Sequence, residues 1–190
     1  MKRAAAVGCL AALLTAGCLL SVSHVEEDQL PAEWRSAFAN LSSDPSALTG
    51  RFSNEGTGVF NEGKESAVRL TDVFFPGAFP RRSGGSVDAV ALDWTPEGKL
   101  RARALSGPTT RAEVVLVASR DAATAWTDVQ GIPVKDTNKF GATMNTQRAR
   151  VALASSGQLY VEVHATAVGI VLFLPAAGAR TVWGRWSPLP

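Results

Sequence analysis

The sequence predicts a mainly β protein, a single antiparallel β-barrel or sandwich of about 8–10 strands with one or two short helices. Two observations support this fold class. Apolar and polar residues alternate with a period of two through much of residues 87–186, and clusters of Gly, Pro, Ser and Asn separate the alternating segments at short intervals. The 190 residues contain no internal repeat, and the part after residue 48 suffices for one hydrophobic core.

Residues 31–47 are expected to form a short helix and a connection to the β domain. Pro31 suits a first helical turn, and Trp34 and Phe38 lie four residues apart, on one face of a helix. Asp44-Pro45 breaks this pattern. The aromatic pair is therefore expected to pack on the domain that follows.

The β domain is expected to span residues 48–190, beginning with a strand at residues 49–52. Residues 54–58 contain two glycines and are expected to form a turn-rich loop. Residues 64–75 carry apolar side chains at near-helical spacing and stop before Pro76, which predicts a second short helix.

The remaining segments alternate as strands do. Strands are predicted at residues 87–94, 99–105, 113–119 and 125–129, followed by a hairpin of residues 148–154 and 158–166 around Ser155-Ser156-Gly157. A second hairpin is predicted from residues 167–174 and 180–186, with its turn at residues 175–179.

The first 17 residues have the three parts of a bacterial export signal. Lys2 and Arg3 precede an apolar core at residues 4–14, and small residues follow it. That core has about 11 residues, fewer than the roughly 20 that a membrane-spanning helix needs. Residues 1–17 are therefore predicted to be a removable signal peptide.

The end of this signal, Thr15-Ala16-Gly17-Cys18, resembles the lipobox of bacterial lipoprotein precursors, although Thr15 stands where that family most often has Leu. The resemblance implies cleavage between Gly17 and Cys18 and a covalent lipid on Cys18. An ordinary secreted protein, cut after Ala16 or Gly17 with a free Cys18, is the alternative. No other cofactor and no metal ion are expected.

The residues after Cys18 bear on localisation. Leu19, Leu20 and Ser21 follow it, whereas lipoproteins of that family that stay at the inner membrane commonly have acidic residues there. The resemblance therefore favours a lipid-anchored protein on the periplasmic face of the outer membrane. The inner membrane and a soluble periplasmic protein remain alternatives.

Residues 18–30 are expected to be a lipidated, acidic spacer, with three consecutive acidic residues at 26–28. The chain has 19 Lys+Arg and 17 Asp+Glu, so removal of Lys2 and Arg3 makes the two numbers equal. This balance argues against a nucleic-acid partner. Cys9 and Cys18 are the only cysteines, so no disulfide and no thiolate metal site is expected after processing.

The two ends of the predicted domain share one motif. Gly50-Arg51-Phe52 and Gly184-Arg185-Trp186 have the same Gly-Arg-aromatic order, and pairing of first and last strands would close a barrel. This arrangement is similar to small lipocalin-like barrels, with Gly50, Phe52 and Arg185 at the matching positions and Phe52 where that family usually has Trp. The resemblance implies a carrier for a small apolar ligand or lipid; a sandwich or half-open barrel is the alternative.

Histidine is the commonest general base near neutral pH, and the chain has two. His24 falls in the spacer and is expected to be solvated. His164 shares a strand face with Tyr160 and Glu162, a possible polar face that is expected to meet solvent. No nucleophile or metal ligand is recognisable beside it, so no catalytic residue is assigned.

The five tryptophans suggest core packing or a binding surface. Strand parity places Trp183 and Trp186 on opposite sides, so one of them is expected to face outward. Together with Arg185 they form a possible ligand or partner surface.

Three functions follow in order of support. The first is a non-enzymatic interaction or assembly module of the cell envelope, held at the membrane by its lipid and binding an envelope protein. The second is a lipocalin-like carrier of a small apolar ligand or lipid. The third is a hydrolytic enzyme.

Overall fold

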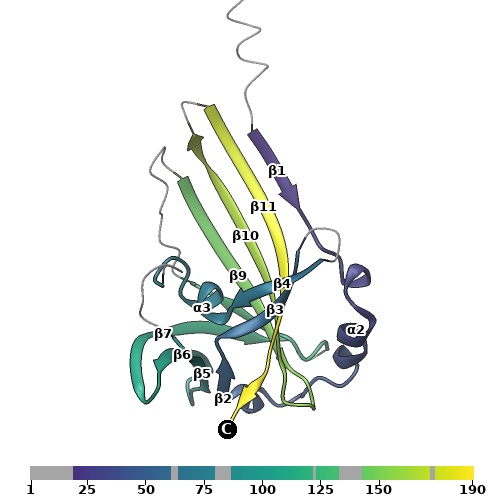
Figure 1. The fold of residues 1–190 in the computed structure, drawn as a ribbon, viewed down its shortest axis with the longest axis vertical. Helices are drawn as coiled ribbons and strands as arrows, with labels where there is room; N and C mark the ends of the chain where they lie inside the picture. Colours follow the sequence, from purple (N-terminus) through teal and green to yellow (C-terminus); the bar gives the residue numbers. More distant parts are fainter. Residues whose placement is uncertain (1–18, 61–63, 80–86, 122, 133–142, 172–173) are drawn as a thin grey trace, which may run out of the picture.

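A computed structural model of the chain describes residues 19–60, 64–79, 87–121, 123–132, 143–171 and 174–190. It is mainly β, with one large sheet and two short α-helices, as the sequence predicts (Figure 1). The predicted signal peptide and Cys18 lie outside the described residues.

Within the described residues, twelve strands form the sheet, more than the 8–10 that the sequence predicts. They are β1 (Leu19–Ser23), β2 (Gly50–Ser53), β3 (Glu55–Phe60), β4 (Lys64–Arg69), β5 (Ala89–Trp94), β6 (Lys99–Ser106), β7 (Thr109–Arg120), β8 (Thr127–Gln130), β9 (Thr143–Leu153), β10 (Leu159–Val171), β11 (Leu174–Trp186) and β12 (Pro188–Leu189). The helical elements are the 3-10 turns η1 (Glu27–Gln29) and η2 (Pro45–Leu48) and the α-helices α2 (Ala32–Phe38) and α3 (Leu70–Phe74).

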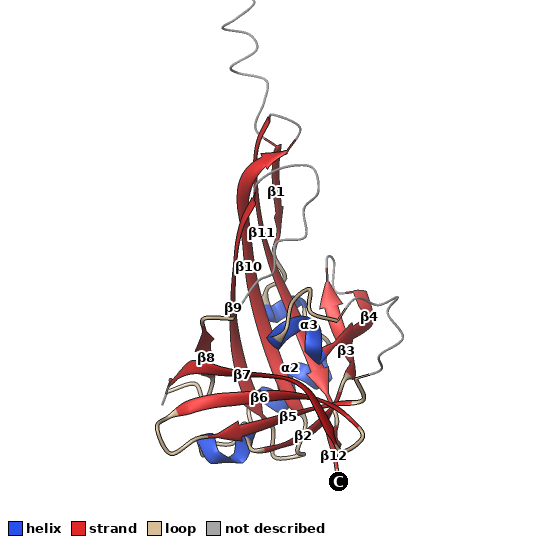
Figure 2. Ribbon diagram, turned by 90° about the vertical axis from the view of Figure 1, so that its left-hand side faces the viewer, coloured by secondary structure: helices blue, strands red, loops and turns tan. Residues whose placement is uncertain are grey.

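The strand order is β12-β2-β5-β6-β7-β8-β9-β10-β11-β3-β4, and all these pairs are antiparallel. β1 adds to β11 as a parallel strand. β9, β10 and β11 are long and extend beyond the body of the domain, and β1 runs beside them (Figures 1 and 2). We call the extending parts of β9, β10 and β11, together with β1, the projecting sheet.

The sheet has two faces with separate cores. The inner face carries Val161 and Val163 of β10 and packs against α3, in a large cluster that includes Leu70, Phe74 and Trp186. The outer face carries the alternate residues and is covered by α2. Its smaller cluster contains Trp34 of α2 with Trp126, Tyr160 and Trp183.

The predicted first helix is confirmed as α2, in which Trp34 is fully buried and Phe38 packs beside it. The second predicted helix, at residues 64–75, is wrong in its first half. Residues 64–69 form β4, which pairs with β3 from Phe60↔Lys64 to Glu55↔Arg69, and only α3 is helical. In the predicted loop at residues 54–58, only Asn54 lies outside a strand, and residues 55–58 belong to β3, where the glycines allow a close approach of β11.

Three further boundaries differ from the prediction. The expected spacer at residues 18–30 contains β1, whose pairing with β11 a local sequence pattern does not reveal. β10 runs unbroken through the boundary predicted between residues 166 and 167. The turn predicted at residues 175–179 is strand, because those residues pair with residues 166–170 of β10.

The first and last segments of the β domain lie side by side, but not as the closed barrel predicted from the two Gly-Arg-aromatic triplets. β2 pairs with β12 and β5, and β11 pairs with β3 and β10, so the strand order has two ends, β12 and β4. A single residue, Asn54, separates β2 from β3, and Ser187 alone separates β11 from β12. These two junctions are in contact, because the Ser53 amide donates a hydrogen bond to the Ser187 carbonyl at 3.0 Å.

Glycines permit this close crossing. A Cβ placed at Gly56 would lie 2.5 Å from the carbonyl oxygen of Arg185 and 2.5 Å from the indole of Trp186. A Cβ at Gly184 would overlap the same indole, and one at Gly58 would overlap Val68. The indole of Trp186 therefore occupies space that any side chain at Gly56 or Gly184 would need.

We predict that Gly56→Ala lowers the free energy of unfolding by about 1–3 kcal/mol, because the added methyl group overpacks the crossing. Urea denaturation of the full chain measures this. Gly50→Ala is the matched control, since a Cβ there meets only ordinary contacts, 3.5 Å from the Phe52 ring. Equal stability of the two variants would contradict the role assigned to the crossing.

Candidate functional site

The predicted surface of Trp183, Arg185 and Trp186 is not exposed as a unit. Trp186 turns to the inner face and is 2 % exposed. Trp183 turns to the outer face, as strand parity predicts, but α2 covers it and leaves it 4 % exposed. Both tryptophans therefore pack inside the molecule, on opposite sides of β11.

The outer-face aromatic residues attach α2 and the N-terminal segment to the sheet. Trp183 stacks on Phe38 with ring centroids 5.6 Å apart, and its indole Nε1 donates to the Val25 carbonyl at 2.9 Å. The guanidinium of Arg185 lies over the Trp34 ring, 5.1 Å from its centroid, and donates to Glu33 Oε1 at 2.8 Å. The side chains of Trp183 and Arg185, which the sequence suggests as part of a binding surface, are therefore engaged in contacts within the protein.

Arg185 remains charged in this position. Partial burial lowers the pKa of its guanidinium, but hydrogen bonds to Glu33 and Tyr160 outweigh that effect and raise the pKa above its ordinary value.

The polar face predicted from Tyr160, Glu162 and His164 does lie on one side of β10, but it is not a plain solvent face. Tyr160 is 1 % exposed and Glu162 is 6 % exposed. The Glu162 carboxylate accepts a hydrogen bond from Arg150 Nη1 at 3.1 Å, and the same guanidinium stands 5.4 Å from the centre of the Trp126 ring. Burial of this carboxylate therefore depends on Arg150.

Both histidines of the chain meet at one threonine, although they are 140 residues apart by number. His24 Nδ1 lies 2.6 Å from the hydroxyl of Thr181, and that hydroxyl lies 3.1 Å from His164 Nδ1. Each imidazole also contacts a glutamate through Nε2: His24 contacts Glu26 at 3.0 Å, and His164 contacts Glu162 at 3.2 Å. We call these five residues the histidine row.

His24 is exposed, as expected, but it directly follows a paired strand and does not lie in an open spacer. Pairing of β1 with β11 runs from Leu19↔Ala176 to Ser23↔Arg180, which brings the next residue, His24, beside Thr181. Nothing in the sequence marks Thr181 as a residue that joins the two histidines. Its role arises only because His164 is its cross-strand partner in β10.

The geometry of the histidine row favours attachment over catalysis. A hydroxyl carries one hydrogen, so Thr181 donates to one imidazole and accepts from the other. Thr181 is 4 % exposed and engaged on both sides, which leaves no approach for a substrate to its oxygen. In this arrangement the row ties β1 to β11 and β10.

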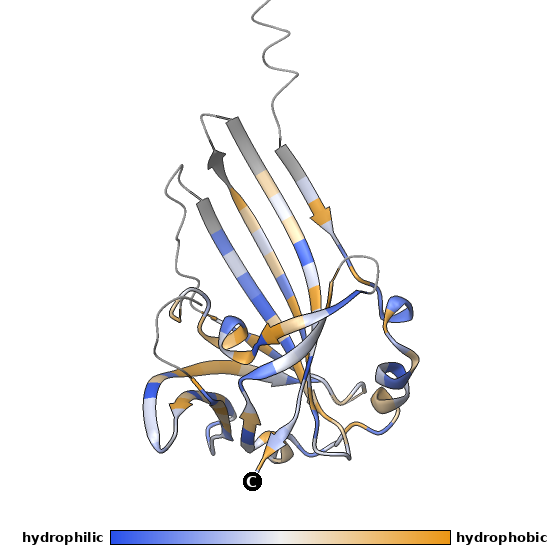
Figure 3. Ribbon diagram, in the orientation of Figure 1, coloured by the Kyte–Doolittle hydropathy of each residue, from blue (hydrophilic) through white to orange (hydrophobic). Residues whose placement is uncertain are grey.

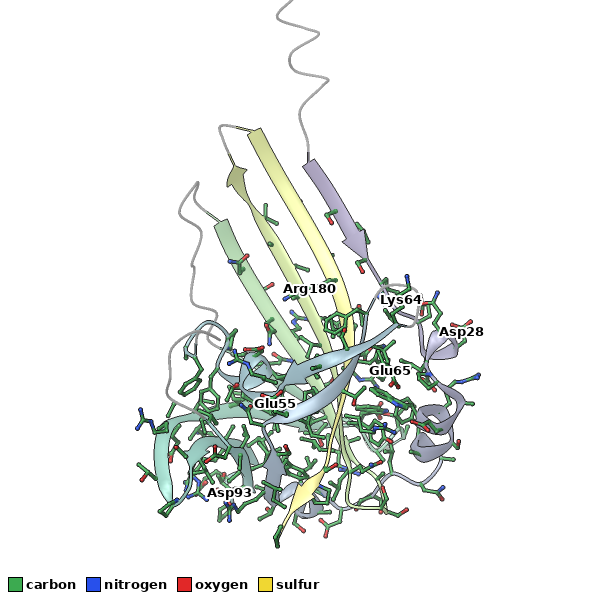
Figure 4. All side chains as sticks on the ribbon, viewed as in Figure 1. Asp28, Glu55, Lys64, Glu65, Asp93 and Arg180 are labelled. Carbon is green, nitrogen blue, oxygen red and sulfur yellow. The ribbon has the colours of Figure 1, made fainter. Side chains whose placement is uncertain are left out.

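The inner face carries two adjoining cavities that sequence reasoning did not find. One has a volume of about 350 Å³ and lies between α3, β4 and the inner face of β10 and β11. The other, about 440 Å³, continues along the inner face of the projecting sheet as far as β1. Both are lined by Arg180, which Figure 4 labels on β11.

The described residues contain no group of three His, Cys, Asp or Glu side chains placed to hold a metal ion. Within the same residues, none of the helices is long and apolar enough to cross a membrane.

We predict that Thr181→Val reduces hydrogen-exchange protection across β1 (Leu19–Ser23), because both imidazoles lose their shared partner while shape is conserved. The global free energy of unfolding should fall by only about 1 kcal/mol, since both histidines are half-exposed and can bond to water. Thr166→Val is the control, as Thr166 bonds to Thr146 on the exposed sheet surface. Unchanged exchange in β1 would count against the row as an attachment.

We predict that Arg150→Met destabilises the protein by about 2–4 kcal/mol by leaving the Glu162 carboxylate buried without its cation. The double variant Arg150→Met/Glu162→Gln should recover most of this loss, because the neutral amide costs less to bury. Thermal or urea unfolding of the three proteins checks the prediction. Additive losses in the double variant would refute the pairing argument.

In comparisons with known proteins, no family model matches the chain, and no curated protein or solved structure gives a significant match.

Proposed function

We propose that this protein is a lipid-anchored envelope protein on the periplasmic face of the outer membrane, where it acts as a non-enzymatic interaction or assembly module. The observation that carries the proposal is the incorporation of β1 into the sheet. β1 begins at Leu19, immediately after the predicted lipidation position, and pairs with Ala176 at the far end of β11 (Figure 1).

This pairing changes how an anchor at Cys18 would act. A solvated spacer would let the domain move freely, whereas a strand fixed to β11 gives it one orientation relative to its attachment point. Two side-chain contacts strengthen the fixation: His24 bonds to Thr181, and the carbonyl of Val25 accepts from Trp183. The projecting sheet then lies between the membrane and the body of the domain.

The outer face of the projecting sheet supports an interaction role. Val22 of β1 is 77 % exposed and Val168 of β10 is 61 % exposed. Both belong to the outer face, since Val22 pairs with Ala179 and Val168 pairs with Ala177. A partner at the membrane surface would find apolar side chains here beside hydrophilic residues of β9 (Figure 3).

We predict that Cys18→Ala leaves the protein either soluble in the periplasm or unprocessed, because several acyl chains together are needed for stable anchoring. Fractionation of envelopes, with the processed size read by mass spectrometry, measures this. The matched control is Ser21→Ala, which leaves the cysteine in place. Membrane retention of a correctly cleaved Cys18→Ala protein would contradict the anchor.

The second candidate is a carrier of a small apolar ligand or lipid, and the cavity of about 350 Å³ favours it. Its volume falls within the roughly 300–1,000 Å³ range of small-molecule sites. A copurified lipid seen by native mass spectrometry of detergent-free protein would support this function over the first.

A further inference from the structure

The two inner-face cavities form one continuous groove. They share the side chains of Gln147 and Arg180 and the turn Pro76-Gly77 that follows α3. The groove therefore runs from the body of the domain, beneath β3 and β4, to the inner face of the projecting sheet.

The end of the groove in the body of the domain is apolar. The residues that line it there include Phe60, Val68, Val73, Val163, Val182 and Trp186. The charged pair at its wall is already neutralised, because Arg69 Nη2 donates to Asp72 Oδ1 at 2.6 Å. An alkyl chain would be removed from water there without breaking any polar contact.

The other end is a shallow trough with a smooth floor. Ala165, Ala167 and Gly178 lie on the inner face of β10 and β11, so the floor is built from small residues. Polar side chains of β9 and β1, including Gln147 and Ser23, stand along its sides. Such a trough suits a polar group that stays partly in water.

Arg180 stands where these two parts meet. It lines both cavities, its side chain is exposed, and it pairs in register with Ala165 on the same face. Among the described residues, no carboxylate forms an ion pair with it. Figure 4 shows its side chain at the base of the projecting sheet. A cation at the mouth of an apolar cavity is electrostatically complementary to an anionic head group.

We infer that this groove binds a single-chain amphiphile with an anionic head group, its alkyl chain in the apolar cavity and its carboxylate or phosphate against Arg180. The inference rests on the carrier function proposed above and names its ligand class. It does not depend on the lipid anchor, so either proposal can fail while the other stands.

The neighbouring strand offers a matched control. Arg148 on β9 is also an exposed arginine in the projecting sheet, but it pairs with His164 and so lies on the outer face. Charge reversal at Arg148 changes the net charge as much as charge reversal at Arg180. It leaves the inner-face groove intact.

The experiment titrates the full chain, carrying Cys18→Ala to prevent lipidation, with three probes below their micellar concentrations. The probes are dodecanoate, lauroyl-lysophosphatidylglycerol and zwitterionic lauroyl-lysophosphatidylcholine, and calorimetry measures binding. We expect one equivalent of an anionic probe to bind, with the zwitterion at least about tenfold weaker. A preference for dodecanoate identifies a carboxylate ligand, and a preference for the lysophosphatidylglycerol identifies a phosphate ligand.

Arg180→Glu should weaken binding of the anionic probe by about tenfold or more, Arg180→Lys should retain part of it, and Arg148→Glu should leave it within about twofold. Unchanged thermal unfolding of the variants shows that they fold. Absence of binding by both anionic probes would overturn the inference. Equal binding of the zwitterion would overturn the role of the charge, and equal losses in Arg148→Glu and Arg180→Glu would overturn its location.

Discussion

The architecture depends on one steric constraint, the absence of side chains at Gly56, Gly58 and Gly184. These glycines let residues 50–60 cross residues 183–189 at a distance that no Cβ would allow. The Trp186 indole fills the space at Gly56 and Gly184, and Val68 fills it at Gly58. The two ends of the β domain consequently support each other without a closed ring of strands. The groove lies directly beside this crossing, since Trp186 and Gly184 line its apolar end.

The inner and outer faces of the sheet serve different purposes. On the outer face, aromatic rings and the histidine row attach α2 and β1 to the long strands β10 and β11. The inner face holds the main core in the body of the domain but continues past it as an open groove. The long strands β10 and β11 therefore hold α2 and β1 on their outer face and line an accessible groove on their inner face.

Period-two alternation predicted the fold class and most strands after residue 87, because those strands pair with sequence neighbours and keep one face in the core. It failed in β1 and β3, which pair with the distant strand β11, and in β4, which pairs with its neighbour β3 although its apolar residues have near-helical spacing. Parity also placed Trp183 and His164 on their faces correctly but could not foresee α2 over Trp183 or Thr181 beside His164. From the sequence alone, Arg180 looks like an ordinary surface residue. Its position between two cavities is known only from the structure.

β1 has a further consequence for the order in which the chain folds. Its partner β11 lies near the other terminus, and His24 and Thr181 are separated by 157 residues. Because synthesis begins at the N-terminus, the chain has to be almost complete before this parallel pairing can form. Contacts between residues so far apart in sequence also form slowly. Until then Leu19–Ser23 has no strand to join, so this segment stays unpaired for most of the synthesis of the chain.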